Sequence, residues 1–226
     1  MEQLIHGDSY KVLKEIKDKS VDLVIIDPPY QFECGGEGGA FGSDKRNYHK
    51  EYLELCKLEA PFTETEKTRV SANADEHRSQ LKQLSAGFTN DILDELVRVM
   101  KKINIYIWCS KAQIKQIWNY FDSKGCNLDL LTWHKTNPIP TCNNTYLNDT
   151  EYLVFAREKG VKLYGSYATK KKYYVTKANV ADKKIYQHPT IKPLDIIKNL
   201  VINSSSGGAT RTRLFYGKWY NRGCLQ

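Results

Sequence analysis

Residues 21–30 read VDLVIIDPPY, an aliphatic run that ends in a carboxylate, two prolines and an aromatic ring. A continuous run of β-branched and aliphatic residues predicts a strand of a parallel sheet that is covered on both faces. Because ligands collect outside the carboxyl ends of such strands, we expect Asp27, Pro28, Pro29 and Tyr30 to form part of a ligand site. The two prolines fix the backbone and remove two amide donors, which leaves carbonyl oxygens as acceptors.

These four residues suit the transfer of a methyl group to the exocyclic amine of a nucleic-acid base. The lone pair of an adenine amine is delocalised into the ring, so the nitrogen is a poor nucleophile until acceptors hold its two hydrogens. Asp27 and the carbonyl of Pro28 can supply those acceptors. Tyr30 offers a ring face on which a flipped base can stack, an interaction worth roughly 1–3 kcal/mol. An ordinary strand-ending turn is the alternative interpretation of the two prolines.

On this motif the sequence resembles the DNA amino-methyltransferases, the adenine-N6 and cytosine-N4 enzymes that use S-adenosylmethionine. A second motif supports the resemblance, because residues 188–193 read HPTIKP and precede an apolar helical pattern. In that family a His-Pro-x-x-Lys-Pro element opens the helix before the cofactor's glycine loop, and the order of the two motifs matches the permuted arrangement of the β group. Pro193 is tolerated in a first helical turn, where amide donors can face an anionic ligand. The resemblance implies a Rossmann-like α/β fold with a doubly wound, mostly parallel sheet.

The resemblance also implies a cofactor site. It assigns contacts with S-adenosylmethionine to Asp27, His188, Thr190 and Lys192, and to Asp8, which follows Gly7 as in the family. Three of these residues have a structural alternative. Asp8 can cap a helix, His188 can be a satisfied structural histidine and Lys192 can be a solvated lysine.

The length and composition are compatible with one α/β domain and a polyanionic partner. The chain has 226 residues, a net charge of +8 and a pI of about 9.0, which suits a polyanionic partner such as double-stranded DNA, although plain cytosolic basicity is the alternative. Its six cysteines are scattered as free thiols, and none follows a proline. We therefore expect neither a metal site nor the Pro-Cys nucleophile of cytosine-C5 methyltransferases. The sequence has no signal-peptide pattern and no apolar run of membrane length, which predicts a cytoplasmic protein.

The rest of the pattern predicts alternating helices and strands. We expect helices near residues 8–16, 89–102, 114–121 and after Pro193, and strands at 103–108, 128–133 and 151–155. Residues 31–88 should add a mobile glycine-rich lid and an inserted polar lobe. This alternation is typical of a doubly wound sheet.

Two segments are candidates for contact with DNA. Residues 161–187 mix lysines with tyrosines, and Lys170, Lys171, Lys172 and Tyr173 are predicted to contact phosphates and bases. A solvated charged face is the alternative. Lys135 lies in the segment WHKTNP (residues 133–138), which resembles the family's lip of the target-base pocket, although it could simply end a strand.

The resemblance covers residues 1–206 and then stops. Family members continue with an apolar strand, a Gly-x-Gly loop and a strand that ends in an acidic residue, whereas residues 207–226 contain no apolar strand and no acidic residue. Codons read from their second base, starting within Arg211, permit Val-Leu-Asp-Ser-Phe-Met-Gly-Ser-Gly, which restores the family pattern apart from one proline. We therefore infer a frameshift near residues 207–209, with true divergence as the alternative. An aberrant tail predicts weak binding of S-adenosylmethionine and an uncovered edge of the sheet.

Two functions from different classes follow. The first is an adenine-N6 DNA methyltransferase, with cytosine-N4 activity as a variant; Asp27 favours adenine, because β-group cytosine-N4 enzymes more often carry Ser at that place. The second is a catalytically inert DNA-binding remnant. Binding of S-adenosylmethionine would separate the two, since only an enzyme needs the cofactor.

Overall fold

The computed structural model describes residue 5, residues 7–31, 87–138, 146–178 and 191–206, and the backbone of residues 211–215. In chain order the elements are α1 (Ser9–Glu15), β1 (Leu23–Asp27), α4 (Asn90–Val99), β2 (Asn104–Cys109), α5 (Ile114–Asp122), β3 (Asn127–Lys135), β4 (Thr150–Arg157), β5 (Tyr173–Thr176), α7 (Leu194–Ser204) and β6 (Arg211–Phe215).

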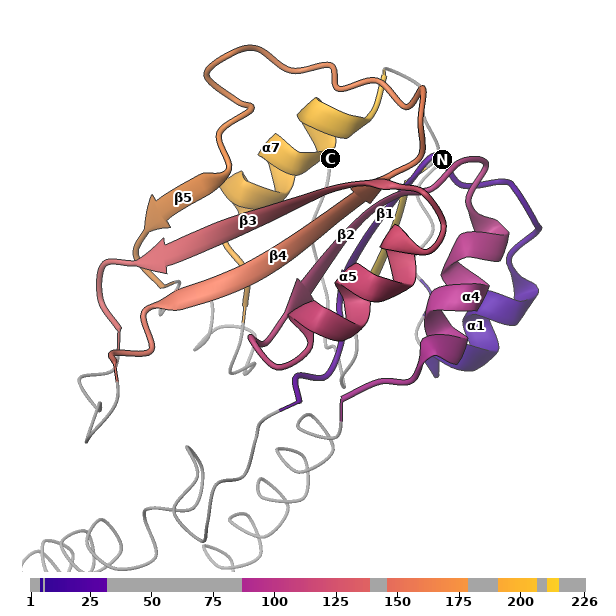
Figure 1. The fold of residues 1–226 in the computed structure, drawn as a ribbon, viewed down its shortest axis with the longest axis horizontal. Coiled ribbons are helices and arrows are strands. Elements are labelled where there is room, and N and C mark those ends of the chain that lie inside the picture. The colour runs from indigo at the N-terminus through magenta and orange to yellow at the C-terminus, as the bar shows by residue number, and fades with distance from the viewer. Residues whose placement is uncertain are drawn as a thin grey trace, which may run out of the picture.

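The described strands form one sheet in the order β5-β3-β4-β2-β1-β6 (Figure 1). β1 lies between β2 and β6 and runs parallel to both. β4 runs antiparallel to β2 and to β3, and β5 runs parallel to β3. The carboxyl ends of β1, β2, β3, β5 and β6 therefore meet the amino end of β4 at one edge of the sheet.

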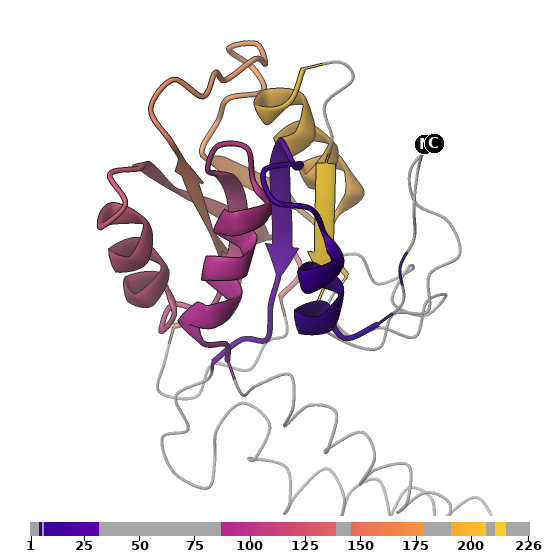
Figure 2. The ribbon, with the colours of Figure 1, turned by 90° about the vertical axis from the view of Figure 1, so that its right-hand side faces the viewer.

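Helices cover both faces of this sheet (Figure 2). Alternation along β1 sends Val24 and Ile26 into a core with α1, α4 and α5, and sends Leu23 and Ile25 into a second core with α7. All four of these side chains are at most 3% exposed, as expected of a strand that is covered on both faces. The predicted α/β architecture with a mostly parallel sheet is confirmed.

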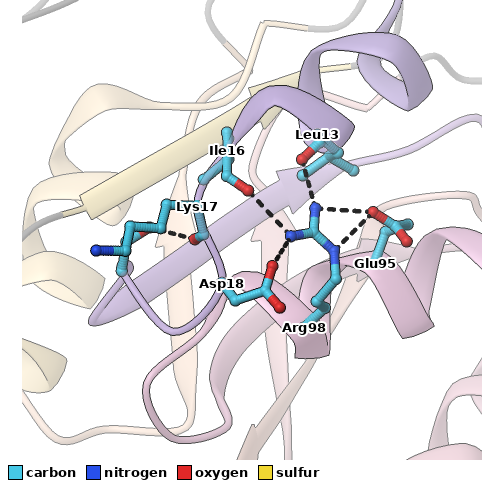
Figure 3. A network of polar contacts seen from close by, with 7 residues as sticks. Leu13, Ile16, Lys17, Asp18, Glu95 and Arg98 are labelled. Atoms are coloured by element: carbon cyan, nitrogen blue, oxygen red, sulfur yellow. Dashed lines mark hydrogen bonds and ion pairs between the residues drawn. The ribbon is translucent and has the colours of Figure 1, made fainter.

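Arg98 ties α1 to α4 on the first of these faces (Figure 3). Its guanidinium donates to the carbonyl oxygens of Leu13, at 2.7 Å, and Ile16, at 3.0 Å, where α1 ends. It also donates to Glu95, at 2.9 and 3.0 Å, and pairs with Asp18. The planar fork thus adds side-chain donors to carbonyl groups at the end of the helix, where intrahelical partners run out.

Most elements lie where the sequence predicts them, but β5 and β6 were not expected. Residues 211–215 pair in parallel register with all five residues of β1. The expectation that no strand follows residue 206, and that this edge of β1 is uncovered, is therefore wrong. A ladder is made by backbone groups, so a polar sequence can occupy an outer position of a sheet without an apolar pattern.

Several predictions fall on residues outside the described ranges. These are the lid beyond Gln31, the inserted lobe, residues 179–187 of the 161–187 segment, and His188 and Thr190. Among the residues that the structure does describe, no helix is both long and apolar enough to cross a membrane.

Candidate active site

Three charged side chains share one face of the sheet where the strands meet. Asp27 is the last residue of β1 and has the parity of Ile25, which packs beneath α7. By the same alternation Lys135, at the end of β3, and Glu151, near the start of β4, lie on the α7 side. Residues distant in the sequence are therefore brought to one edge by strand direction and parity.

Lys192 joins these groups from the helical layer above, since it lies two residues before α7 begins. Its ammonium nitrogen is 3.0 Å from Oδ1 of Asp27 and 3.0 Å from Oε2 of Glu151, and 2% of its side chain is exposed. The nitrogen of Lys135 is 2.6 Å from Oε1 of Glu151. Two carboxylates and two ammonium groups thus form a charge-balanced cluster, which we call the Asp27–Lys192–Glu151–Lys135 cluster.

Aromatic rings enclose this cluster. The hydroxyl of Tyr30 donates to Oε2 of Glu151 at 3.2 Å. The ammonium of Lys192 lies 4.9 Å from the centre of the Tyr30 ring and 5.1 Å from that of Trp108. These are favourable distances for a cation over an aromatic face. A base that stacks on Tyr30 therefore has to use the face opposite Lys192.

The backbone after Asp27 is held by a buried amide. Nε2 of Gln113 donates to the carbonyl oxygen of Pro29 at 2.9 Å, and Oγ of Ser110 donates to that of Gln31 at 2.6 Å. The Pro29 carbonyl therefore already accepts a hydrogen bond within the protein. The role of the Pro28 carbonyl stays a prediction.

Burial and charge act differently on the two carboxylates. Burial would raise the pKa of Glu151, but Lys192 and Lys135 outweigh it and hold this pKa at about 2. Burial also raises the pKa of Asp27, and here it outweighs Lys192, with the charge of Glu151 acting in the same direction as burial. Burial disfavours the charge on Lys192, yet the two carboxylates prevail and raise its pKa. Asp27 is therefore the more basic carboxylate of the pair.

The predicted cofactor residues do not all come together. Oδ1 of Asp8 accepts from the backbone amide of Tyr10 at 2.9 Å, so Asp8 is the N-cap of α1, as the structural alternative proposed. Lys192 is neither solvated nor unpaired, because it is bonded to Asp27 and Glu151. Contacts of Asp8, Asp27 and Lys192 with S-adenosylmethionine remain predictions.

The predicted DNA-binding residues separate into two places. Residues 170–173 are exposed and lie at the start of β5, where Tyr173 is opposite Thr132. Lys135 is three residues further along β3 and belongs to the active-site edge. Lys172 pairs with Asp129, and the nitrogen of Lys171 lies 6.0 Å from the centre of the Tyr173 ring.

A polar network anchors the segment before β5 to α7. The carbonyl oxygen of Thr169 accepts from Asn199 at 2.7 Å and from Asn203 at 2.8 Å, and the Thr169 hydroxyl donates to Oδ1 of Asn203 at 2.8 Å. Asn199 also donates to the hydroxyl of Tyr174 at 2.9 Å. These hydrogen bonds hold Thr169 against α7, and the three lysines follow directly after it.

Three residues of the site were missed from the sequence: Glu151, Trp108 and Gln113. Glu151 was identified only as part of a strand, although a carboxylate with the parity of buried Leu153 is a detectable anomaly. Trp108 was identified as the end of a strand. Gln113 showed no signal, because its role depends on a contact with a backbone carbonyl across the sheet.

The sheet topology is compatible with a cofactor at this edge. α4, which connects β1 to β2, lies on one face, and α7, which precedes β6, lies on the other, so the connections diverge at β1 and β6. Register places Asp27 level with Phe215, the last residue of β6. Such a divergence point is where doubly wound sheets bind ligands.

The fold is of the Rossmann-like α/β class. A family model described as DNA methylase, covering N6 and N4 methyltransferases, matches residues 21–217. The chain therefore belongs to this family of DNA methyltransferases, whose methyl donor is S-adenosylmethionine. The match extends past residue 206, where the resemblance was expected to stop.

Individual proteins agree with this assignment. The chain is 26% identical over 222 residues to the type II methyltransferase M2.LlaDCHI of Lactococcus lactis subsp. cremoris, a match that covers 89% of this chain and 72% of the relative. It is 24% identical over 225 residues to the type II methyltransferase M2.DpnII of Streptococcus pneumoniae, covering 91% and 73%.

Solved structures show the same fold at low sequence identity. The complex of M1.HpyAVI with S-adenosylmethionine matches with a TM-score of 0.57 and 17% identity, covering 94% of this chain and 82% of the other. The cytosine-N4-specific PvuII DNA methyltransferase matches with a TM-score of 0.54 and 13% identity, covering 92% and 71%.

Proposed function

We propose that this site transfers a methyl group from S-adenosylmethionine to the N6 amine of adenine in double-stranded DNA. The observation that carries the proposal is Asp27, a carboxylate with a raised pKa at the end of β1 and level with the end of β6. Asp at this position favours adenine over cytosine, because β-group cytosine-N4 enzymes more often carry Ser there.

Asp27 acts on the target amine as a hydrogen-bond acceptor. S-adenosylmethionine supplies an electrophilic methyl group on a sulfonium. Asp27 accepts a hydrogen bond from one amine hydrogen, and the Pro28 carbonyl accepts one from the other. These two bonds favour a tetrahedral nitrogen, whose lone pair is no longer delocalised into the ring. The nitrogen loses a proton as it gains the methyl group, and the raised pKa suits Asp27 to receive that proton.

Tyr30 positions the base. Its hydroxyl is held by Glu151 at 3.2 Å, which fixes the orientation of the ring. An adenine flipped out of the duplex stacks on the ring face opposite Lys192, with its amine toward Asp27. Stacking of this kind contributes about 1–3 kcal/mol per base and compensates part of the cost of unstacking.

The remaining predicted contacts belong to the same proposal. We assign cofactor contacts to Asp8, Asp27, His188 and Thr190, with Lys192 acting on the cofactor side through its bond to Asp27. Lys170, Lys171, Lys172 and Tyr173 contact the DNA backbone from the exposed start of β5, and Lys135 lies nearer the flipped base.

Identification of the methylated nucleoside tests the proposal. Duplex DNA is incubated with isotopically labelled S-adenosylmethionine and either the chain or a version whose reading frame is restored after residue 206, and the digested nucleosides are separated by mass spectrometry. The expected product is N6-methyladenine, formed faster by the restored version. Labelled N4-methylcytosine would contradict the assignment to adenine, and no labelled nucleoside from either version would favour the inert DNA-binding remnant.

A further inference from the structure

We propose that Glu151 is a positioning residue for methyl transfer: it shares the ammonium group of Lys192 with Asp27 and so keeps Asp27 a strong acceptor for the target amine. The inference rests on the proposed role of Asp27 and adds a residue that does not itself touch the base.

The geometry makes Lys192 a shared partner. Its nitrogen is 3.0 Å from each carboxylate, so both carboxylates form an ion pair with the same ammonium group. Asp27 comes from β1 and Glu151 from β4, and these strands are separated in the sheet by β2. Lys192 bridges them over the ring of Trp108, which belongs to β2. The bridge therefore depends on the relative position of three strands and the start of α7.

Charge balance explains why two carboxylates are needed. A lysine bonded to Asp27 alone would neutralise it and compete with the amine for the same oxygens. Glu151 draws Lys192 away from that state, and Lys135 at 2.6 Å supports Glu151 in turn. Without the charge of Glu151, Asp27 would be the single carboxylate partner of Lys192 and would become a weaker acceptor.

The titratable groups of the cluster come from every neighbouring element of the described part. Tyr30 after β1, Glu151 on β4 and Lys192 before α7 act on Asp27 itself. Cys109 at the end of β2 interacts with Tyr30 and Lys192, and Lys135 on β3 pairs with Glu151. Burial raises the pKa of Cys109 to about 12 and that of Tyr30 well above its usual value, so both stay neutral. The charge that Asp27 meets at neutral pH is thus set by Glu151 and the two lysines.

An NMR titration of the full chain, labelled with 13C at the aspartate carboxyl carbons, tests the sharing directly. Asp27→Asn identifies the Asp27 signal by its loss. Glu151→Gln is expected to move the titration of Asp27 to lower pH, because a neighbouring negative charge is removed. Lys135→Gln, a change at a less buried position, is expected to move it to higher pH. Glu95→Gln removes a carboxylate from the Arg98 network on the opposite face and should leave it unmoved.

An Asp27 titration that is unchanged in folded Glu151→Gln, or unmoved by Lys135→Gln, would overturn the inference. Single-turnover methylation adds a second measure. Glu151→Gln should lower the rate by about 10-fold, a loss typical of residues that support a reacting group, with DNA affinity within about twofold of the parent. The acid limb of its pH–rate profile should move to lower pH, and Glu151→Asp should recover part of the rate.

The two proposals fail in different ways. A parent chain that titrates as expected but does not methylate adenine counts against the proposed function and leaves the coupling of Glu151 to Asp27 intact. A parent that methylates adenine, together with a Glu151→Gln variant of unchanged rate and unchanged acid limb, overturns the role of Glu151 alone.

Discussion

Asp27 and Glu151 are two largely buried carboxylates that share one lysine, and their surroundings give them different properties. Glu151 has two ammonium partners and stays ionised down to a pKa of about 2, whereas Asp27 has one and its pKa is raised by burial. The first is suited to hold charges in place, and the second is suited to accept hydrogen from a substrate. Two carboxylates of the same chemistry therefore have different proposed roles: Glu151 supports the site and Asp27 acts on the substrate.

Glu151→Gln is predicted to lower the free energy of unfolding by about 3 kcal/mol at pH 7, because the variant leaves the buried Lys192 and the partly buried Lys135 with one carboxylate. A carboxylate whose folded pKa is depressed stabilises the fold above its unfolded value of 4.5, and this stabilisation is lost as pH falls through about 2. Urea unfolding of parent and variant between pH 7 and pH 2 should therefore give a difference that shrinks below about pH 4.5. A difference that is constant across this window would contradict the charged role of Glu151.

The site was only half predictable at this scale. Asp27 and Tyr30 were predictable because both belong to one short motif, residues 27–30, directly after an apolar run. The roles of Glu151 and Gln113 arise from contacts between residues far apart in the chain, at 3.0 Å to Lys192 and 2.9 Å to the carbonyl of Pro29. Such contacts depend on strand order and parity, which a local pattern does not contain.

The elements follow the sequence where burial sets the pattern. β1 and β2 are apolar because both of their faces are covered, and α4 and α5 each bury one apolar stripe. β5 and β6 escaped prediction for the opposite reason. β5 is four residues long with two exposed positions, and β6 reads RTRLF, so backbone pairing with a neighbour determines both.

Arg98→Ala is predicted to destabilise the fold by about 2 kcal/mol, since it removes charged hydrogen bonds to the end of α1 and leaves Glu95 without its partner. Arg98→Lys should recover little of the loss, because an ammonium cannot reproduce the planar fork. Thermal or urea unfolding of the three proteins provides the measurement. Full recovery by lysine would mean that charge alone, and not the bonds to the Leu13 and Ile16 carbonyls, links α1 to α4.

The start of β5 permits a test of DNA contact. Replacing Lys170, Lys171 and Lys172 with Ala should weaken binding to all duplex sequences alike and reduce the slope of log K against log salt by nearly one unit per lost phosphate contact. Lys172 should contribute least, because it already pairs with Asp129. Lys11→Ala/Lys14→Ala on α1, exposed over the opposite face, is the matched control. An unchanged salt slope in the triple variant would make the 170–172 segment an ordinary solvated surface.

At the scale of the whole molecule, the fold brings the base site and the expected cofactor site to one edge. Asp27 ends β1 and is paired in register with the last residue of β6. The helix that follows β1, α4, packs on one face of the sheet, and the helix that precedes β6, α7, packs on the other. The family match extends to residue 217, beyond residue 206, where the sequence motifs predicted that the resemblance stops. Residues 211–215 also pair with β1 as a strand. Residues 216–226 contain neither a Gly-x-Gly pattern nor an acidic residue.

The chain is therefore predicted to bind S-adenosylmethionine at least about tenfold more weakly than a version with the reading frame restored after residue 206, a difference of roughly 1.4 kcal/mol. A glycine loop allows the backbone to approach the ligand, and a carboxylate on the next strand holds its ribose. Calorimetric titration of both proteins measures the difference. Equal micromolar binding would indicate that Asp8, Asp27 and the segment from His188 to Lys192 suffice to hold the cofactor.

Asp27→Ala is the variant that tests the central claim most directly. Methyl transfer to duplex DNA is measured with the frame-restored protein, its Asp27→Ala variant and the Glu95→Gln control, together with DNA affinity by fluorescence anisotropy. We predict that Asp27→Ala lowers the rate to about 1% of the parent or less, because no other residue of the motif supplies a charged acceptor, while DNA affinity stays within about twofold and the control keeps its rate. Methylation by Asp27→Ala at more than a few per cent of the parent rate would contradict the account.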